Sequence, residues 1–222
     1  MDYKNIIDNK LYISCSDFVN IKSFFTSDKQ ELSLDKLCLP QNHNYSPKRL
    51  TDFSNGRYCA MKALERFGIQ DAVIPIGEER EPIWPDGIVG SISHCDSLTG
   101  AIVAKKSDHI SLGLDIEEIG RVTPDLWELV FTENEKNFLF SLSKEDQRVK
   151  STAIFSIKEA FYKFQHPLTK TFLDFLDVEV VLPGLNQVEV ILETIEPLSI
   201  IRRNQVMHRI ENDCIISLIV AV

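Results

Sequence analysis

The chain has 222 residues, 44% of them hydrophobic, which is enough to bury a core as one large domain or as two small ones. Its formal net charge of -9 at pH 7 argues against a general nucleic-acid binder, because non-specific affinity for nucleic acids comes from cationic contacts to phosphate. No apolar run is long enough to span a membrane, and the charged residues 1–10 do not form a secretory signal, so we expect a cytoplasmic protein without a membrane partner.

The five cysteines are widely scattered and never occur in a Cys-x-x-Cys spacing. Zinc sites and redox pairs need closely spaced cysteines. The pattern therefore predicts reduced thiols, most of them buried.

In chain order, the first clear signal is a helix between Ser46 and Phe67, after a mixed N-terminal stretch. Ser46 fits the N-cap, Pro47 fits the first helical position, and Gly68 follows as a stop signal. Residues at helical spacing predict the buried face of this helix: Leu50, Phe53, Met61 and Leu64.

Arg57 falls in the middle of that apolar face. A buried guanidinium must be paired and hydrogen-bonded, or its side chain must extend to the surface. One interpretation is a salt bridge to a core carboxylate or a side chain that reaches solvent, and the other is an anion site. The helix pattern alone favours the first.

Residues 88–106 predict a strand, a polar turn and a second strand, with Ser93 and His94 at the turn. Serine and histidine in turns usually form local hydrogen bonds, and adjacency alone does not make them a nucleophile and its base. Taken by itself, this segment indicates no catalytic site.

The next strand, predicted over Ile110 to Ile116, leads to Asp115 and Glu117. Side chains two positions apart in a strand share a face, so these two carboxylates lie side by side. Mg²⁺ takes carboxylate oxygens together with substrate phosphates, which suits an acidic pair and one distant glutamate. The pattern therefore predicts a site for a hard cation.

The distant glutamate is Glu159, on a helix predicted over Val149 to Phe164 and closed by His166-Pro167. Glu159 and Lys163 lie on the polar face, one turn apart. Such a pair is also a common surface ion pair worth about 0.2–0.5 kcal/mol. Thr132 and Glu135 have the spacing of a capping box for a helix over 132–140. Alternating residues 174–190 and the apolar run 215–222 predict strands, so the class is α+β with antiparallel sheet.

In their order and spacing these motifs resemble the 4'-phosphopantetheinyl transferases of the larger, Sfp- and EntD-like type. The resemblance covers roughly residues 46–181. It rests on four motifs: WPDG at Trp84–Gly87, GSISHC at Gly90–Cys95, GLDIE at Gly113–Glu117 and FSIKEAFYK at Phe155–Lys163, with a PLTK stretch at 167–170.

The resemblance implies two similar α+β subdomains with antiparallel sheets and packed helices, related by a pseudo-twofold axis, with the active site in the cleft between them. The boundary would fall near Ser111. Residues 1–111 would contact the phosphates of coenzyme A, and residues 112–222 would hold the metal site, the catalytic carboxylates and the carrier-docking surface. Members of this type are monomers, so we expect a monomer.

The implied reaction transfers the 4'-phosphopantetheine group of coenzyme A to a serine of an apo acyl, aryl or peptidyl carrier protein and gives adenosine 3',5'-bisphosphate. It depends on Mg²⁺ or Mn²⁺ and would serve siderophore, nonribosomal peptide or polyketide synthesis. Positioning and charge neutralisation, rather than covalent catalysis, drive such phosphoryl transfers. The same residues would also suit a Mg²⁺-dependent nucleotide-diphosphate hydrolase. A non-catalytic coenzyme A- or carrier-binding module would need a missing carboxylate, and none is missing.

The resemblance also implies a role for each matching residue. The metal ligands are Asp115, Glu117 and Glu159. Glu159 is the expected general base, with a metal-bound water near Glu117 as the second choice. The residues expected to contact coenzyme A are Lys163 and Lys158 near the diphosphate, Ser93 and His94 on its phosphates, Arg49 and Arg57 near the 3'-phosphate, and Arg80 before the WPDG motif.

The family docks its carrier near the segment that follows the paired carboxylates, here Gly120 to Phe140. Carrier proteins are acidic, so an acidic enzyme needs a local basic or apolar patch there. The candidate docking residues are Arg121, Leu126, Trp127 and Phe131.

Overall fold

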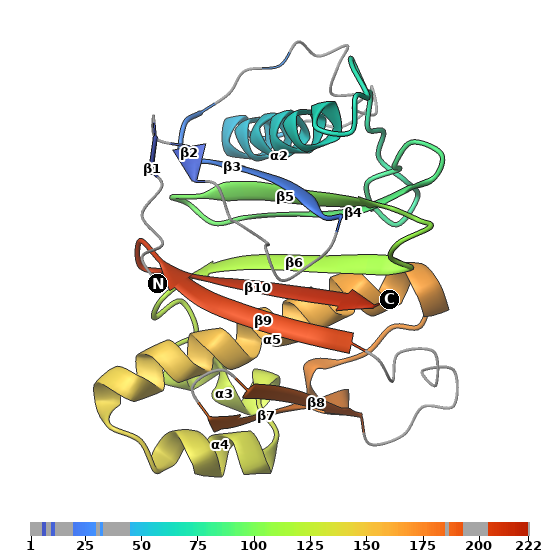
Figure 1. Ribbon diagram of the computed structural model, residues 1–222. Helices are drawn as coiled ribbons and strands as arrows, with labels where there is room; N and C mark the ends of the chain where they lie inside the picture. Colours follow the sequence, from blue (N-terminus) through green and yellow to red (C-terminus); the bar gives the residue numbers. More distant parts are fainter. Residues whose placement is uncertain are drawn as a thin grey trace. The chain divides into compact units, whose positions relative to one another are not determined.

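The computed structural model describes residues 6–7, 10–11, 20–29, 32, 45–184, 187–192 and 204–221. The chain divides into two compact units, Met1–Ile110 and Ser111–Val222. The first unit combines antiparallel strands with one described helix and the second combines antiparallel strands with several, which confirms the predicted α+β class (Figure 1). Among the described helices, none combines the length and the apolar character that a membrane span requires.

The first unit is built on a three-stranded sheet in the order β3-β5-β4. Helix α2 packs against this sheet (Figure 1). Its elements are β3 (Lys22–Thr26), α2 (Pro47–Glu65), β4 (Ile88–His94) and β5 (Thr99–Lys105), preceded by the short pair β1 (Ile6–Ile7) and β2 (Lys10–Leu11). The predicted start of α2 is confirmed, since the Ser46 side chain accepts a hydrogen bond from the Arg49 amide.

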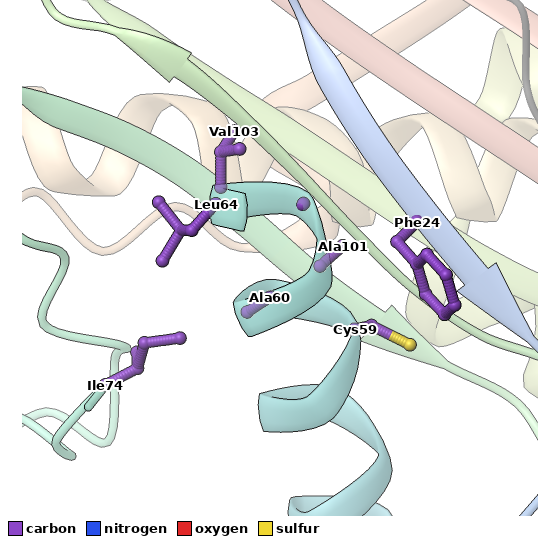
Figure 2. Close-up of a cluster of buried hydrophobic side chains, with 8 residues drawn as sticks. Phe24, Cys59, Ala60, Leu64, Ile74, Ala101 and Val103 are labelled. Carbon is purple, nitrogen blue, oxygen red and sulfur yellow. The ribbon is translucent and has the colours of Figure 1, made fainter. Parts of the chain in front are cut away.

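Small residues on α2 let the helix lie close to the sheet. Cys59, Ala60 and Ala63 are fully buried, and larger side chains fill the space around them (Figure 2). The rest of this cluster comes from β3, from the end of α2, from the loop after α2 and from β5: Phe24, Leu64, Ile74, Ala101 and Val103.

The WPDG motif forms a turn that folds back on β4. Gly87 has a φ of +75°, a conformation that favours glycine, and it leads directly into the strand. A Cβ atom at Gly90 would lie 2.7 Å from the Trp84 ring, so this ring covers β4 at the one position without a side chain. The packing of the Trp84 ring on Gly90 therefore accounts for the short distance in sequence between the WPDG and GSISHC motifs.

The second unit has a three-stranded sheet in the order β6-β10-β9, and α5 packs against β6 and β10 (Figure 1). Short helices and a hairpin complete the unit. Its elements are β6 (Ser111–Glu118), η1 (Pro124–Leu126), α3 (Trp127–Val130), α4 (Glu133–Phe140), α5 (Lys144–Thr169), η2 (Phe175–Asp177), β7 (Val178–Gly184), β8 (Gln187–Leu192), β9 (Asn204–Glu211) and β10 (Cys214–Ala221).

Both units repeat one topology. In each, an edge strand is followed by the main helix and then by two strands, of which the last lies in the centre of the sheet. The order β3-α2-β4-β5 thus corresponds to β6-α5-β9-β10. This similarity is carried by strand order and is not visible as a sequence repeat.

Helix α5 is longer than the predicted Val149–Phe164. It begins after the N-cap Ser143, runs through Pro167 and ends at Lys170, which adopts a left-handed φ of 54°. The expectation that Pro167 closes the helix is wrong, because a proline near the C-terminal end removes one hydrogen bond and the last turn is retained by the Lys170 amide bonding to the His166 carbonyl. The predicted capping box of Thr132 and Glu135 is confirmed.

Candidate active site

Gly113 sets how closely α5 approaches β6. A Cβ atom at this position would overlap the Ala160 carbonyl oxygen and lie 2.8 Å from the Phe164 Cβ atom, so only glycine allows the contact. The Ser111 hydroxyl donates to the Phe164 carbonyl at 2.7 Å and fixes the same crossing. Since side chains two apart share a face of a strand, Asp115 also faces α5.

An ion pair joins β6 to α5 at this crossing. Lys163 Nζ lies 2.7 Å from Asp115 Oδ1, and Asp115 is buried while the lysine is part-exposed. The two residues are 48 positions apart in the sequence. The structure therefore brings together the paired carboxylates of GLDIE and the last lysine of FSIKEAFYK.

Two further carboxylates share this lysine. Burial raises the pKa of Glu117 to about 8, with repulsion from Asp115 and Glu159 acting in the same direction and the cations of Lys163 and Arg121 opposing it. Burial also raises the pKa of Glu159, and the Asp115 charge adds to this rise while Lys163 opposes it. Three acidic groups around one ammonium leave an excess of negative charge.

The donors fit a hard divalent cation in their chemistry. Carboxylate oxygens are the ligands that Mg²⁺ prefers, and it usually binds one or two of them together with water and substrate phosphates. Among the described residues, no three or more His, Cys, Asp or Glu side chains are grouped closely enough to hold a metal ion by themselves. Asp115, Glu117 and Glu159 thus form an open acidic cluster, whose excess charge a cation would offset.

Lys158 lies elsewhere in the second unit. Its side chain is 1% exposed, and Nζ donates to Glu135 Oε2 at 2.7 Å, to the Val130 carbonyl at 2.9 Å and to the Phe175 carbonyl at 2.8 Å. An ammonium group has three protons, and these bonds use all of them. The structure does not bring Lys158 to the acidic cluster and leaves it no donor for a diphosphate.

Glu135, which the sequence indicated only as part of a helix cap, is the centre of this buried group. It accepts the amides of Thr132 and Val180 at 2.8 Å and 2.7 Å, as well as Lys158. Burial raises the pKa of Glu135 and lowers the pKa of Lys158, and each charge opposes the shift of the other. The pair fastens α4, α5, η2 and β7 together.

In the first unit, Arg57 is buried on α2. Its Nε atom donates to the Ile74 carbonyl at 3.3 Å, and its guanidinium lies 5.1 Å from the centre of the Phe53 ring. The Arg49 guanidinium lies 4.6 Å from the same ring. Sequence reasoning selected both arginines but treated Phe53 only as a core residue.

Ser93 and His94 are the last two residues of β4 rather than part of the turn. Ser93 is buried and His94 is exposed. Two contacts tie α2 to this region: a Cβ atom at Gly56 would lie 2.9 Å from Ile92 Cγ2, and Lys48 Nζ lies 2.6 Å from Asp96 Oδ1. The first turns of α2 therefore run beside the strand end that bears Ser93 and His94.

Arg80 lies in the loop between α2 and β4. It is exposed and has a φ of 68°, in a turn closed by its amide bonding to the Gly77 carbonyl. The structure places it in an open loop, without a described contact to Arg49 or Arg57.

The candidate docking segment divides into buried and exposed residues. Trp127 is 3% exposed and Phe131 is 1% exposed, so the prediction that they contact a partner is wrong. Their rings pack edge-on in the core, 6.0 Å apart. Leu126 and Arg121 are exposed as expected, and the largest exposed apolar groups nearby are Leu129 and Phe140, at 67% and 65%.

An aromatic group lies next to the acidic cluster along α5. Tyr162 and His166 stack at 5.1 Å, and the exposed Phe172 meets Tyr162 at 6.1 Å. Positions three and four apart share a helix face, so Tyr162 and His166 continue the face of Glu159. Sequence reasoning missed these rings, since an aromatic residue at helical spacing more often indicates a core position.

Two protein-family models match this chain. Residues 40–104 match the 4'-phosphopantetheinyl transferase N-terminal domain, and residues 111–214 match the 4'-phosphopantetheinyl transferase superfamily. The two matched segments fall within the two units of the structure.

Individual relatives carry related names. The chain is 38% identical over 135 residues to 4'-phosphopantetheinyl transferase Svp of Streptomyces mobaraensis. This alignment covers 60% of the present chain and 55% of the Streptomyces protein. It is 34% identical over 158 residues to enterobactin synthase component D of Escherichia coli O157:H7. This second alignment covers 66% of the present chain and 70% of the Escherichia coli protein. The chain thus spans little more than half of the Svp protein.

Among solved structures, the chain is similar to a holo-(acyl-carrier-protein) synthase from Bacillus anthracis str. Ames, determined in complex with CoA (3',5'-ADP). The sequence identity is 23% and the TM-score is 0.39, over 49% of this chain and 92% of that chain.

Proposed function

Since this chain belongs to the 4'-phosphopantetheinyl transferase superfamily, we propose that it moves the 4'-phosphopantetheine group of coenzyme A to a serine of an apo carrier protein. The observation that carries this proposal is the acidic cluster Asp115, Glu117 and Glu159 around Lys163. Such a cluster suits a reaction on a diphosphate, because charge neutralisation and positioning lower its barrier.

In this reaction, the serine oxygen forms a bond to the phosphorus that carries pantetheine. The bond from that phosphorus to the bridging oxygen breaks, and adenosine 3',5'-bisphosphate leaves with this oxygen. Lys163 would donate hydrogen bonds to the diphosphate and offset its charge. When bound at Asp115, Glu117 and Glu159, a Mg²⁺ or Mn²⁺ ion would supply further positive charge at the phosphoryl oxygens.

Glu159 is our proposed general base for the serine hydroxyl. Without a bound cation, burial and the neighbouring Asp115 raise the pKa of Glu159, and a carboxylate of raised pKa accepts a proton more readily than an ordinary glutamate. Without a bound cation, Glu117 has the same property, with a pKa of about 8, and this supports the alternative in which a water beside Glu117 takes the proton and passes it to that carboxylate.

The first unit would bind the phosphates of coenzyme A. Arg49 and Arg57 offer two guanidinium groups on one ring for the 3'-phosphate, and Ser93 and His94 lie beside the start of the same helix. Guanidinium groups are suited to phosphate because their planar N–H donors match its oxygens. Arg80 remains a candidate through its exposed position alone.

The carrier protein would dock on an apolar surface of Leu126, Leu129 and Phe140, which takes the place of the buried Trp127 and Phe131. The aromatic group of Tyr162 and Phe172, beside Glu159, would receive the pantetheine arm. The name of one relative, enterobactin synthase component D, favours a carrier from siderophore or other nonribosomal peptide synthesis, with polyketide synthesis as the related choice.

Intact mass spectrometry of several apo carrier proteins tests this function. After incubation with the chain, coenzyme A and Mg²⁺, a carrier should gain one phosphopantetheine, and Asp115→Asn or Glu159→Gln should abolish the gain. Glu145→Gln is the matched control, because Glu145 lies on the same helix but is exposed and pairs only loosely with Arg148 at 3.5 Å. Release of adenosine 3',5'-bisphosphate without any carrier would instead support a hydrolase.

A further inference from the structure

One aromatic ring lies between two arginines on α2. The Phe53 ring is 4.6 Å from the Arg49 guanidinium and 5.1 Å from the Arg57 guanidinium, and Tyr45 meets it edge-on at 6.0 Å. Phe53 is only partly buried, and two cations lie over its ring, so packing in the core does not by itself explain this arrangement.

The ring brings the two charges closer together than the helix does. Positions 49 and 57 are separated by about 12 Å along a helix axis. Both guanidinium groups nevertheless lie over one ring, where the negative face of the aromatic system attracts them and offsets part of their mutual repulsion. Arg57 is also held by burial and by the Ile74 carbonyl. Arg49 is exposed, so the ring is its main described side-chain contact.

A guanidinium whose flat face lies on a ring does not use its N–H donors in that contact. The contact with a ring uses the flat face of the group, whereas its five N–H donors lie in its plane. A terminal phosphate monoester carries about -1.5 to -2 charges near neutral pH and accepts several such hydrogen bonds. Two oriented guanidinium groups therefore match one terminal phosphate better than two mobile ones.

We propose that Phe53 is a positioning residue that fixes Arg49 and Arg57 as a pair for the 3'-phosphate of coenzyme A, and that it thereby makes the protein select coenzyme A over 3'-dephospho-coenzyme A. This inference rests on the proposed function, which places the 3'-phosphate at these two arginines. Phe53 itself does not touch the reacting atoms.

Calorimetric binding of coenzyme A and of 3'-dephospho-coenzyme A to three variants tests the proposal. Phe53→Leu keeps an apolar side chain but removes the ring, so the Kd for coenzyme A should rise about tenfold, as expected for the loss of two cation–π contacts. The Kd for 3'-dephospho-coenzyme A should stay within about twofold, because that ligand has no phosphate for the pair. Phe53→Tyr keeps the ring and should retain the selectivity of the natural protein.

Phe67→Leu is the matched control. Phe67 also carries two cations, Lys22 at 5.8 Å and Lys105 at 6.0 Å, in the same unit, but it lies away from the two arginines. Its loss should leave the ratio of the two Kd values unchanged. Equal weakening of both ligands by Phe53→Leu, or an unchanged ratio, would overturn the proposal.

The binding experiment can distinguish failure of the proposed role of Phe53 from failure of the proposed transferase function. A protein that binds coenzyme A with this selectivity but modifies no carrier would contradict the transferase proposal and leave the role of Phe53 standing. A natural protein that binds both ligands equally would show that no 3'-phosphate site exists at Arg49 and Arg57, which would overturn the role of Phe53.

Discussion

At the scale of single residues, the two lysines of one motif have opposite roles. Lys158 and Lys163 are five positions apart on α5, so they point in different directions around the helix. Lys163 reaches the part-exposed acidic cluster, whereas Lys158 enters the core and bonds to Glu135. The charge of a side chain thus says little about its role until the direction in which the side chain points from the helix is known.

Glu117→Gln should stabilise the metal-free protein at alkaline pH. Below about 4.5, Glu117 is protonated in the folded and the unfolded state alike, so it contributes nothing to the pH dependence. Between about 4.5 and about 8 the unfolded chain has released a proton that the folded protein still holds, so stability falls as the pH rises.

Thermal unfolding measures this effect. The variant should melt at a higher temperature than the natural protein at pH 8.5, and the difference should vanish at pH 4, because glutamine does not titrate. An equal gain at both pH values would show that titration of Glu117 is not its cause.

Lys158→Met should destabilise the protein by about 3–5 kcal/mol, the usual effect of leaving one partner of a buried ion pair without its counterpart. Lys144→Met, at an exposed position of the same helix, should change the free energy of unfolding by less than about 0.5 kcal/mol. Urea unfolding measures both. A change of less than about 0.5 kcal/mol in the free energy of unfolding for Lys158→Met would contradict the buried hydrogen bonds of Lys158. It would instead support the expectation that Lys158 binds the diphosphate.

At the scale of elements, the site depends on how closely one helix lies on one strand. The Asp115–Lys163 pair forms because α5 contacts β6 directly at Gly113. Glycine occupies this position for the space it leaves, in contrast to Gly68 and Gly87, where positive φ values of 78° and 75° are the reason. A single missing Cβ atom therefore sets the distance between the two halves of the acidic cluster.

Gly113→Ala should reduce transfer activity more than its loss of stability explains. The added methyl group forces α5 away from β6, which costs about 1–3 kcal/mol and lengthens the Asp115–Lys163 contact. Gly68→Ala is the control, since its Cβ would meet nothing within 4 Å and its cost of about 1–2 kcal/mol arises from backbone strain alone. Initial transfer rates measured well below both melting temperatures should fall only for Gly113→Ala, and equal rates would contradict the packing argument.

At the scale of the whole molecule, two units of one topology carry different chemistry. The first presents cations on α2, and the second presents carboxylates on β6 and α5. The net charge of -9 for the whole chain therefore does not predict the local charge at the candidate site of either unit. We expect the proposed carrier to be recognised mainly by apolar contact, and Leu129 and Phe140 offer the most exposed apolar area near the second unit's helices α3 and α4.

Leu129→Ser together with Phe140→Ser should raise the KM for the carrier about tenfold and leave the KM for coenzyme A unchanged, because central apolar contacts supply most of the energy of such interfaces. Ile210→Ser, at a residue that is also exposed but lies on β9, is the control and should change neither constant. An unchanged carrier KM in the double variant would exclude this surface. Trp127→Ala, by contrast, should act on stability, since its ring is in the core.

The sequence alone determined the features that depend on neighbours along the chain. Ser46 and Thr132 predict the starts of two helices, because an N-cap bonds to an amide only three residues further along the chain. The order and spacing of the WPDG, GLDIE and FSIKEAFYK motifs indicate the family. Only the tertiary structure decided which side chains are buried and which cations meet which anions. Lys158 points into the core because it bonds to Glu135, which lies 23 positions away in the sequence. Trp127 packs against both the neighbouring Phe131 and the more distant Phe140. A local sequence pattern does not predict contacts between segments that only folding brings together.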